Sequence, residues 1–291
     1  MSRVSPKVLA LLGTLTLMWG TNWPLFRIAL AELPVFTFRT LVLLSGVTVL
    51  AAILLARRET FAVPRDKWPV LLLASTMNIG IWNIATSLAV LYVPSGHASV
   101  LAYTMPLWVA VLGFAVFGQK LTGRLLAAIL IGAAAVAALM IPNFQSYATA
   151  PAGLFWGLLA GFCWAVGTLV VKRTSWPGMG LSLTFWQLVL MLPPIALGAL
   201  IFDGLPAHLP SAKVLVATIY TGAIPMAIGT SIWFTLVKLL PAQVAAISSI
   251  AIPIVAIVSG IVILQEPLST LQAIAIGSTA ISLWLALVPG R

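Results

Sequence analysis

The sequence has very few charged residues for its length. Only 15 Lys and Arg and 5 Asp and Glu occur among 291 residues, which is 7% of the chain. Soluble domains average about 25% charged residues, so this composition cannot cover a water-facing surface and excludes a soluble globular protein. Hydrophobic residues make up 62% of the chain and the mean hydropathy is +1.14, which also excludes a disordered chain.

The sequence also lacks the motifs of several chemical functions. Its single cysteine, Cys163, lies in an apolar run, which excludes an intrachain disulfide and indicates a buried, inert thiol. Neither a zinc motif nor a glycine-rich phosphate loop is present, so we predict no metal, no cofactor and no ATP-driven step. Ser95 and His97 are two residues apart, on nearly opposite helix faces, and cannot form a nucleophile and base pair. We therefore predict that the protein is not an enzyme.

Long apolar runs dominate what is present. Runs of about 20 apolar residues are typical of membrane-spanning helices, whereas a β-barrel would show polar and apolar alternation. The first run is too long for the apolar core of a signal peptide and is interpreted as a retained span. The pattern predicts an all-α integral membrane protein with ten transmembrane helices, at about residues 8–31, 33–56, 69–92, 95–117, 124–141, 153–172, 180–202, 213–238, 241–264 and 268–288.

The basic residues are distributed unevenly between the two sides of the membrane. With ten spans, 12 of the 15 fall in the links and termini on the N-terminal side, and only Arg27, Arg39 and Lys213 fall on the other side. Because cytoplasmic loops carry the excess of Lys and Arg, both termini are predicted to be cytoplasmic. The net charge of +10 is therefore attributed to the basic residues of the cytoplasmic links, and no nucleic-acid partner is predicted.

The two halves of the sequence resemble each other at a nearly constant offset. Two prolines twelve residues apart recur 147 residues later (Pro94 and Pro106, then Pro241 and Pro253). Trp19 recurs at an offset of 145 as Trp164. We predict two five-helix repeats in one membrane domain, at residues 1–147 and 148–291. An odd number of helices inverts the second copy, as in secondary transporters with a substrate site between their halves.

Two of these prolines, Pro106 and Pro253, fall in the middle of predicted spans. Proline inside a helix removes a hydrogen bond and frees a carbonyl group. The pair is interpreted either as a packing feature of bent helices or as paired hinges beside a cavity.

Polar and aromatic side chains inside the spans are the candidates for substrate binding. Trp19, Asn22, Trp23 and Phe26 follow helical spacing on the first run. The full candidate set is Trp19, Asn22, Asn78, Trp82, Asn83, Tyr103, Trp164, Gln187, Trp233 and Ser248. The amides can instead join helices by hydrogen bonds. Together these residues would line an uncharged cavity suited to a small amphipathic solute with an apolar or aromatic body, and their aromatic faces would also tolerate a cation.

Ionisable groups are almost absent from the predicted spans. No carboxylate lies at depth, which argues against a carboxylate proton relay. His97, about one turn into the fourth span, is a possible titratable group or a structural one. Arg39 lies shortly inside the second span, where its side chain can snorkel to the outer face or meet a carboxylate in a cavity.

Three short motifs carry a resemblance to a known family. They are Trp19-Gly20-Thr21-Asn22, Pro94-x-x-x-Ala98 through Pro106, and Leu264-Gln265-Glu266-Pro267-Leu268-Ser269 followed by Gly277. With ten spans in two halves, the chain resembles the drug/metabolite transporter superfamily, EamA type. It is most similar to the bacterial aromatic amino-acid and paraquat exporter (YddG) group. Lys120 departs from the pattern, since the first repeat of this family often carries a glutamate there.

The resemblance implies export of aromatic and other apolar amino acids across the bacterial inner membrane. A carrier of this kind has a small-molecule substrate and the lipid bilayer as its partners, and a single chain suffices for the predicted fold. The nearest alternative is an efflux carrier for drugs, cationic compounds or other metabolites, with or without proton coupling. A channel is a weaker alternative, because the sequence shows no ring of like charges or carbonyl groups.

Overall fold

The computed structural model describes residues 5–116, 150–204, 209–241, 244–246 and 249–265, with isolated positions between 118 and 134 and residue 281. Every regular element in these residues is helical. Most of the predicted spans 124–141 and 268–288 therefore lies outside the described residues, and so does the candidate Ser248.

The first half of the chain forms a series of helices with short connections. Ser5 accepts a hydrogen bond from the backbone of Val8 and so caps the first helix, as serine often does. The elements in order are α1 (Pro6–Gly20), α2 (Asn22–Ala29), α3 (Val35–Ala56), η1 (Arg65–Lys67), α4 (Trp68–Ser75), η2 (Thr76–Ile81), α5 (Trp82–Tyr92), α6 (Ser95–Ala102) and α7 (Met105–Ala115).

The second half repeats this pattern of long and interrupted helices. The helix that begins at Ala212 is capped by Ser211, whose hydroxyl accepts a hydrogen bond from the backbone N–H of Val214. The elements are α10 (Pro151–Arg173), α11 (Ser182–Gly198), η4 (Ala199–Asp203), α12 (Ala212–Thr221), η5 (Gly222–Gly229), α13 (Thr230–Leu239), η6 (Ser249–Ala251) and α15 (Ile252–Leu264).

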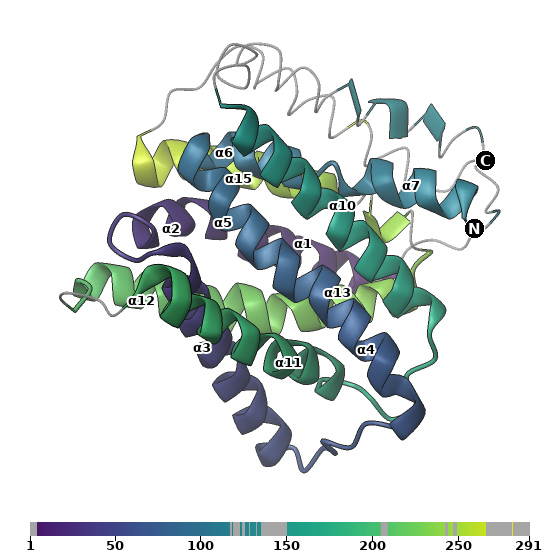
Figure 1. The fold of residues 1–291 in the computed structure, drawn as a ribbon. Helices are drawn as coiled ribbons and strands as arrows, with labels where there is room; N and C mark the ends of the chain where they lie inside the picture. Colours follow the sequence, from purple (N-terminus) through teal and green to yellow (C-terminus); the bar gives the residue numbers. More distant parts are fainter. Residues whose placement is uncertain are drawn as a thin grey trace.

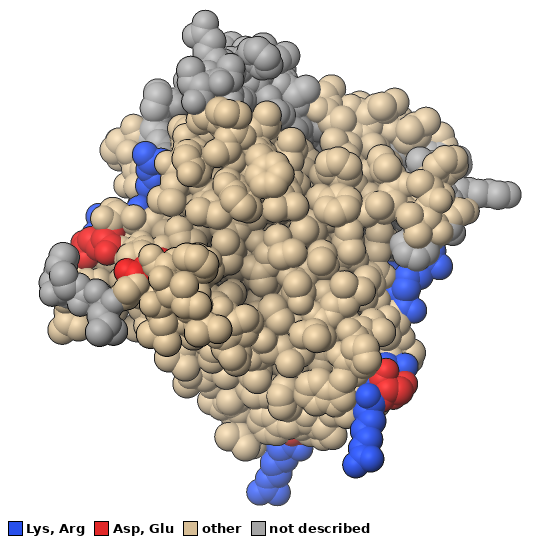
Figure 2. All heavy atoms as spheres, in the orientation of Figure 1, with Lys and Arg blue, Asp and Glu red and all other residues tan. Residues whose placement is uncertain are grey.

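Six helical stretches within the described residues are long and apolar enough to cross a membrane. They are Val35–Ala56, Arg65–Tyr92, Ser95–Ala115, Pro151–Arg173, Ser182–Asp203 and Ala212–Leu239. Each coincides with a predicted apolar run, which confirms the protein as an α-helical membrane protein. Figure 2 shows a broad face without charged side chains, with Lys, Arg, Asp and Glu near its margins, as expected where lipid covers the middle of the molecule.

Two stretches contain π-helical segments at matching places. The segment η2 lies between α4 and α5, and η5 lies between α12 and α13. Thr76–Ile81 and Gly222–Gly229 are separated by the same offset of about 147 residues as the paired prolines. Pro225 supplies a local cause for η5, because it cannot donate the backbone hydrogen bond that a regular α-helix needs. Such segments are frequent at functional sites.

The sequence pattern predicts that Pro106 and Pro253 lie in the middle of continuous, bent helices. The structure differs, because neither proline lies inside a continuous helix. Each occupies one of the first two positions of a new helix, α7 or α15. The chain turns at Tyr103 and Thr104 before α7, and η6 precedes α15. A missing backbone N–H has little cost at a helix start, so the interruption lies just before each proline.

The two halves interleave rather than pack as separate bodies. Helix α3 lies beside α11, α5 beside α10, and α1 beside α15 (Figure 1). Glycines on α10 permit close approach, because a Cβ atom at Gly157 would collide with Leu101, and one at Gly153 would collide with Tyr92 and Val93. The core of the molecule is therefore made by helices from both halves.

Polar side chains tie helix ends together. The Arg27 guanidinium donates to the Val90 carbonyl at 3.2 Å, and the Lys172 ammonium donates to the Val237 carbonyl at 2.7 Å. These pairs match at offsets of 145 and 147 residues. A cation at a helix C-terminus satisfies its free carbonyl groups and its dipole. The same type of contact therefore closes one helix end in each half.

Two carboxylates bind helix starts in the opposite half. Asp203 accepts from the backbone N–H and the hydroxyl of Thr37, at 2.6 and 2.8 Å, and Glu32 accepts from the backbone N–H and the hydroxyl of Ser211, at 2.6 and 2.7 Å. Carboxylates at helix N-termini are stabilising.

Candidate functional site

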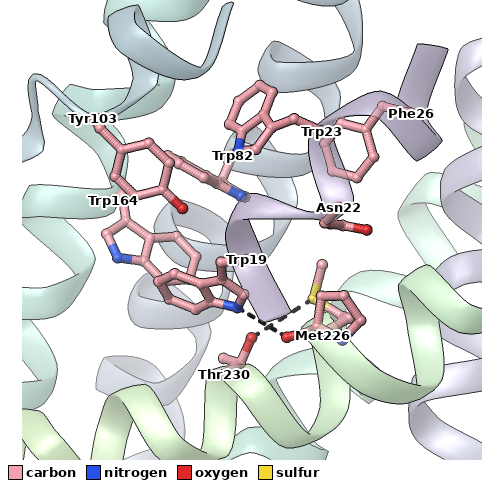
Figure 3. A pocket seen from close by; sticks show the side chains of 10 residues that line it. Trp19, Asn22, Trp23, Phe26, Trp82, Tyr103, Trp164, Met226 and Thr230 are labelled. Atoms are coloured by element: carbon pink, nitrogen blue, oxygen red, sulfur yellow. Dashed lines mark hydrogen bonds between the residues drawn. The ribbon is translucent and has the colours of Figure 1, made fainter. Parts of the chain in front are cut away.

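A small cavity lies where helices from both halves meet. Its wall is formed by Trp19, Asn22, Trp23, Phe26, Trp82, Tyr103, Trp164, Pro225, Met226 and Thr230 (Figure 3). These residues come from α1, α2, α5, the end of α6, α10, η5 and the start of α13. The cavity has a volume of about 30 Å³, far less than the roughly 300–1,000 Å³ of occupied small-molecule pockets. The cavity in this structure is therefore too small to hold an amino acid.

Four of the predicted tryptophans form one connected cluster beside this cavity. The ring centroids of Trp82 and Trp164 are 4.7 Å apart, and those of Trp19 and Trp164 are 5.3 Å apart in an edge-to-face arrangement. Trp233 is not part of the cavity wall, but its ring centroid lies 5.6 Å from that of Trp19. These spacings are favourable for aromatic pairs. The cluster provides large apolar faces from both halves of the chain.

Tyr103 and Trp23 extend the aromatic wall on the side of α2. The Tyr103 ring lies 6.3 Å from Trp82 and 6.2 Å from Trp23, measured between centroids. Figure 3 shows the Tyr103 hydroxyl directed toward the tryptophan rings. The break between α6 and α7 places Tyr103 here, because the residue ends one helix just before the next begins.

One hydrogen bond beside the cavity connects α1, in the first half, to η5, in the second half. The Trp19 indole nitrogen donates to the Pro225 carbonyl at 3.0 Å (Figure 3). A Cβ atom at Gly229 would fall 2.6 Å from the same indole nitrogen, so α1 lies directly against η5. This close approach contracts the cavity.

Asn22 is the polar group of the cavity wall that lacks a partner. Its side-chain oxygen is buried and accepts no hydrogen bond from the described residues. Opposite, the Thr230 hydroxyl donates to the Met226 sulfur at 4.0 Å, its one hydrogen bond to the described residues. An unpaired buried acceptor has a free-energy cost, which a bound donor group would remove.

Three predicted amides do not line the cavity. The Asn78 amide nitrogen donates to the Gln187 side-chain oxygen at 3.3 Å, so these two residues join η2 to α11. The Asn83 amide nitrogen donates to the Ile79 carbonyl at 2.7 Å within its own helix. Asn78, Asn83 and Gln187 are fully buried beside the cavity rather than in its wall. The contact between Asn78 and Gln187 is that of helix-joining amides, whereas the Asn83 contact is local.

Other predicted residues also lie outside the wall. Trp233 is fully buried behind Trp19 and donates to the Thr168 hydroxyl at 3.4 Å. His97 lies partly buried on α6, near its start. The two prolines, Pro106 and Pro253, are buried at the helix starts described above.

The structure adds five residues to the predicted wall, namely Trp23, Phe26, Pro225, Met226 and Thr230. Trp23 and Phe26 belong to the helical aromatic stripe of the first run, so the spacing contained a signal for them. Pro225 and Met226 line the cavity because η5 turns them toward α1, and a sequence pattern does not reveal that rotation. Among the described residues, no group of three or more His, Cys, Asp or Glu could hold a metal ion.

The model of the EamA-like transporter family matches residues 7–141 and again residues 151–288. The chain belongs to this family. The resemblance to that family, predicted from short motifs, is confirmed, and the protein is a membrane transporter by family.

Several relatives of the chain are named as transporters or efflux pumps. The uncharacterized transporter YvbV of Bacillus subtilis is 26% identical over 89% of this chain and 84% of its own length. A probable amino-acid metabolite efflux pump of Escherichia coli is 27% identical over 91% of this chain and 89% of its own. A solved structure that is 20% identical covers 98% of this chain and 97% of its own with a TM-score of 0.78, which supports the fold alone.

Proposed function

We propose that the protein is a secondary carrier that exports small amphipathic metabolites across the bacterial inner membrane. The substrates are aromatic and other apolar amino acids. The observation that carries this proposal is the contracted aromatic cavity, whose wall comes from both halves of the chain. The name of the Escherichia coli relative, an amino-acid metabolite efflux pump, agrees with this substrate class.

The mechanism proposed is alternating access between two inverted five-helix repeats, with ten spans and both termini in the cytoplasm. The two matches to the family model support two repeats. The matched π segments η2 and η5, and the matched contacts of Arg27 and Lys172, support the same division. Inverted repeats allow one scaffold to open to either side of the membrane in turn.

The cavity must widen before it can hold an amino acid, since about 30 Å³ accommodates little more than water. Separation of α1 from η5 would break the Trp19–Pro225 hydrogen bond and enlarge the site. The helix breaks before Pro106 and Pro253 are the hinges that we propose for this motion. Both breaks adjoin helices that pack against helices of the other half: α6 and α7 contact α10, and α15 contacts α1.

We further propose that transport is facilitative. The described spans contain no carboxylate at the cavity, and a proton relay usually employs one. The second candidate function is efflux of cationic compounds, which the aromatic faces of Trp19, Trp82 and Trp164 would favour.

The test is uptake by liposomes that contain only this protein, with labelled phenylalanine, labelled threonine and a labelled aromatic cation offered separately. Saturable uptake of the amino acids without a pH gradient is expected. Uptake of the cation alone would establish the second candidate. Uptake of none of the three would contradict the substrate class, and an absolute need for a pH gradient would contradict facilitative transport.

A further inference from the structure

The most unusual charged group in the described chain is Arg39. Its side chain lies on α3 and is completely buried, so it does not snorkel to a membrane surface. The transfer of an arginine from water to the protein interior is costly unless partners replace its hydration. The partners of Arg39 therefore indicate what this cation does.

Only neutral groups surround Arg39 in the described residues. Its Nε donates to the Ser87 hydroxyl at 2.6 Å, and one terminal nitrogen donates to the Thr86 hydroxyl at 2.9 Å. The other terminal nitrogen, Nη1, has no hydrogen-bond partner there. The guanidinium carbon Cζ lies 4.1 Å from the ring centroid of Phe26 and 4.8 Å from that of Phe38. Such cation–π contacts offset part of the burial cost.

No acidic side chain in the described residues is paired with Arg39. The four described carboxylates contact other groups: Glu32 binds Ser211, Glu59 binds Arg57, Asp66 binds Lys67 and Asp203 binds Thr37. A buried arginine is normally paired with a carboxylate through its planar fork. In the described part of this protein the cation is present and its counter-charge is not.

Arg39 lies behind the wall of the cavity. Phe26, whose ring covers the guanidinium, is itself a cavity-lining residue. Thr86, which holds one nitrogen of Arg39, lies one helical turn from Trp82, another wall residue. The Phe26 ring therefore lies between the guanidinium and the cavity.

An unpaired acceptor lies one turn from Phe26 on the same helix. Asn22, with its free side-chain oxygen, precedes Phe26 by four residues on α2, so both project from one face. A cation that lacks a counter-charge and an acceptor that lacks a donor thus both adjoin Phe26. The Cβ atoms of Asn22 and Phe26 are roughly 5–6 Å apart, one helical turn, and the guanidinium carbon of Arg39 lies 4.1 Å from the Phe26 ring centroid. This pair is complementary to a zwitterion, whose carboxylate and ammonium groups lie side by side.

We infer that Arg39 is the carboxylate-binding residue of the carrier, reached when Phe26 moves aside, while the Asn22 side-chain oxygen accepts from the substrate's ammonium group. This inference rests on the proposed function and narrows it to solutes that bear a carboxylate. The same cation disfavours aromatic cations at the site by direct repulsion.

The experiment measures binding by quenching of tryptophan fluorescence in detergent-solubilised protein. The ligands are phenylalanine, 3-phenylpropionate, which lacks the ammonium group, and phenylalaninamide and phenethylamine, which lack the carboxylate. The unaltered protein is expected to bind phenylalanine at least tenfold more tightly than either amine. This series needs no variant, so it tests the inference even if a substitution at Arg39 prevents folding.

Arg39→Gln is expected to weaken binding of phenylalanine and 3-phenylpropionate by tenfold or more and to leave the two amines unchanged or tighter. Lys213→Gln is the matched control, because it removes one positive charge from an exposed position, and it should change none of the affinities. Equal affinity of the unaltered protein for acids and amines, or an Arg39→Gln variant with unchanged preference, would overturn the inference.

Failure of the inference is distinguishable from failure of the proposed function. Saturable phenylalanine flux together with carboxylate-independent binding would overturn the role of Arg39 alone. Carboxylate-dependent binding that Arg39→Gln removes, without any flux in liposomes, would support the role of Arg39 and contradict carrier activity. Binding of none of the four ligands would overturn the inference.

Discussion

The indole nitrogen of Trp19 donates a 3.0 Å hydrogen bond to the backbone carbonyl of Pro225. The two residues are 206 positions apart in sequence, and their contact joins α1 to η5 at the cavity wall. A π-helical segment has carbonyl groups that a regular helix would occupy internally, which explains how Pro225 can accept from a side chain. In the proposed mechanism this contact stabilises the conformation with a small cavity and breaks when the cavity opens.

The Trp19→Phe variant is expected to populate a state with an open cavity more often than the unaltered protein. Phenylalanine keeps an aromatic ring but leaves the Pro225 carbonyl without its donor, which removes about 1 kcal/mol from the contracted state. A cysteine at Thr230, a wall residue, should then react severalfold faster with a soluble maleimide. The measurement uses a Cys163→Ala background, since Cys163 is the only native cysteine.

The control for that variant is Trp176→Phe. Trp176 is also buried and also donates to a carbonyl, that of Val171 at 2.9 Å, but it does not line the cavity. Its substitution should leave the labelling rate at position 230 unchanged. Equal rates in all three proteins would show that the Trp19 hydrogen bond does not limit opening.

Gly167→Ala should destabilise the protein and disturb the buried amide pair. A Cβ atom at Gly167 would collide with the side chain of Asn78, which donates to Gln187. Overpacking of this kind costs about 1–3 kcal/mol. Thermal unfolding in detergent should show the loss. Gly13→Ala is the matched control, because no atom lies within 4 Å of a Cβ atom there, and a similar loss in both variants would contradict the collision.

Sequence patterns predicted the aromatic wall better than the buried amides. Trp19, Trp82 and Trp164 were predicted because they lie deep inside apolar runs, and the structure brings all three to one cavity. Asn78 and Trp82 were expected on one face by ideal helical spacing. Asn78 lies within the π segment η2, which ends just before Trp82, so the spacing of 3.6 residues per turn does not hold and Asn78 faces α11 instead.

The pairing of distant helices could not be predicted from the spacing within each helix. Arg39 illustrates this limit, since its sequence position allowed either a surface or a buried location. Its burial depends on hydroxyl partners on α5 and on two phenylalanine rings. Such convergence of several helices is a tertiary property and leaves no periodic signal in the sequence.

Asp203→Asn should lower the stability of the protein modestly. The carboxylate accepts from the Thr37 backbone N–H and hydroxyl at the start of α3, and loss of a helix cap of this kind costs about 1 kcal/mol. A lower unfolding temperature by light-scattering or fluorescence detection is expected. Asp66→Asn, which alters the pair between the exposed Asp66 and the partly buried Lys67, should have little effect. If the two variants unfold at the same temperature, the Asp203 cap is not a stabilising contact.

Single cysteines should report the proposed topology. Thr60, in the connection after α3, is expected to face the cytoplasm, and Leu209, which is 89% exposed before α12, is expected to face outside. In Cys163→Ala protein, Leu209→Cys should react with an impermeant maleimide in intact spheroplasts. Thr60→Cys should react only after permeabilisation. The reverse pattern would contradict cytoplasmic termini, and equal labelling of both would contradict an odd number of spans between them.

Counterflow tests alternating access at the aromatic cavity most directly. Liposomes loaded with unlabelled phenylalanine are diluted into a trace of labelled phenylalanine, and internal label is followed over time. If the carrier exposes one site to each side in turn, label should accumulate transiently above its equilibrium level. Trp164→Ala removes a wall residue that also belongs to the aromatic cluster, and it should abolish this accumulation. Entry of label that rises to equilibrium without an overshoot would contradict alternating access by the unaltered protein.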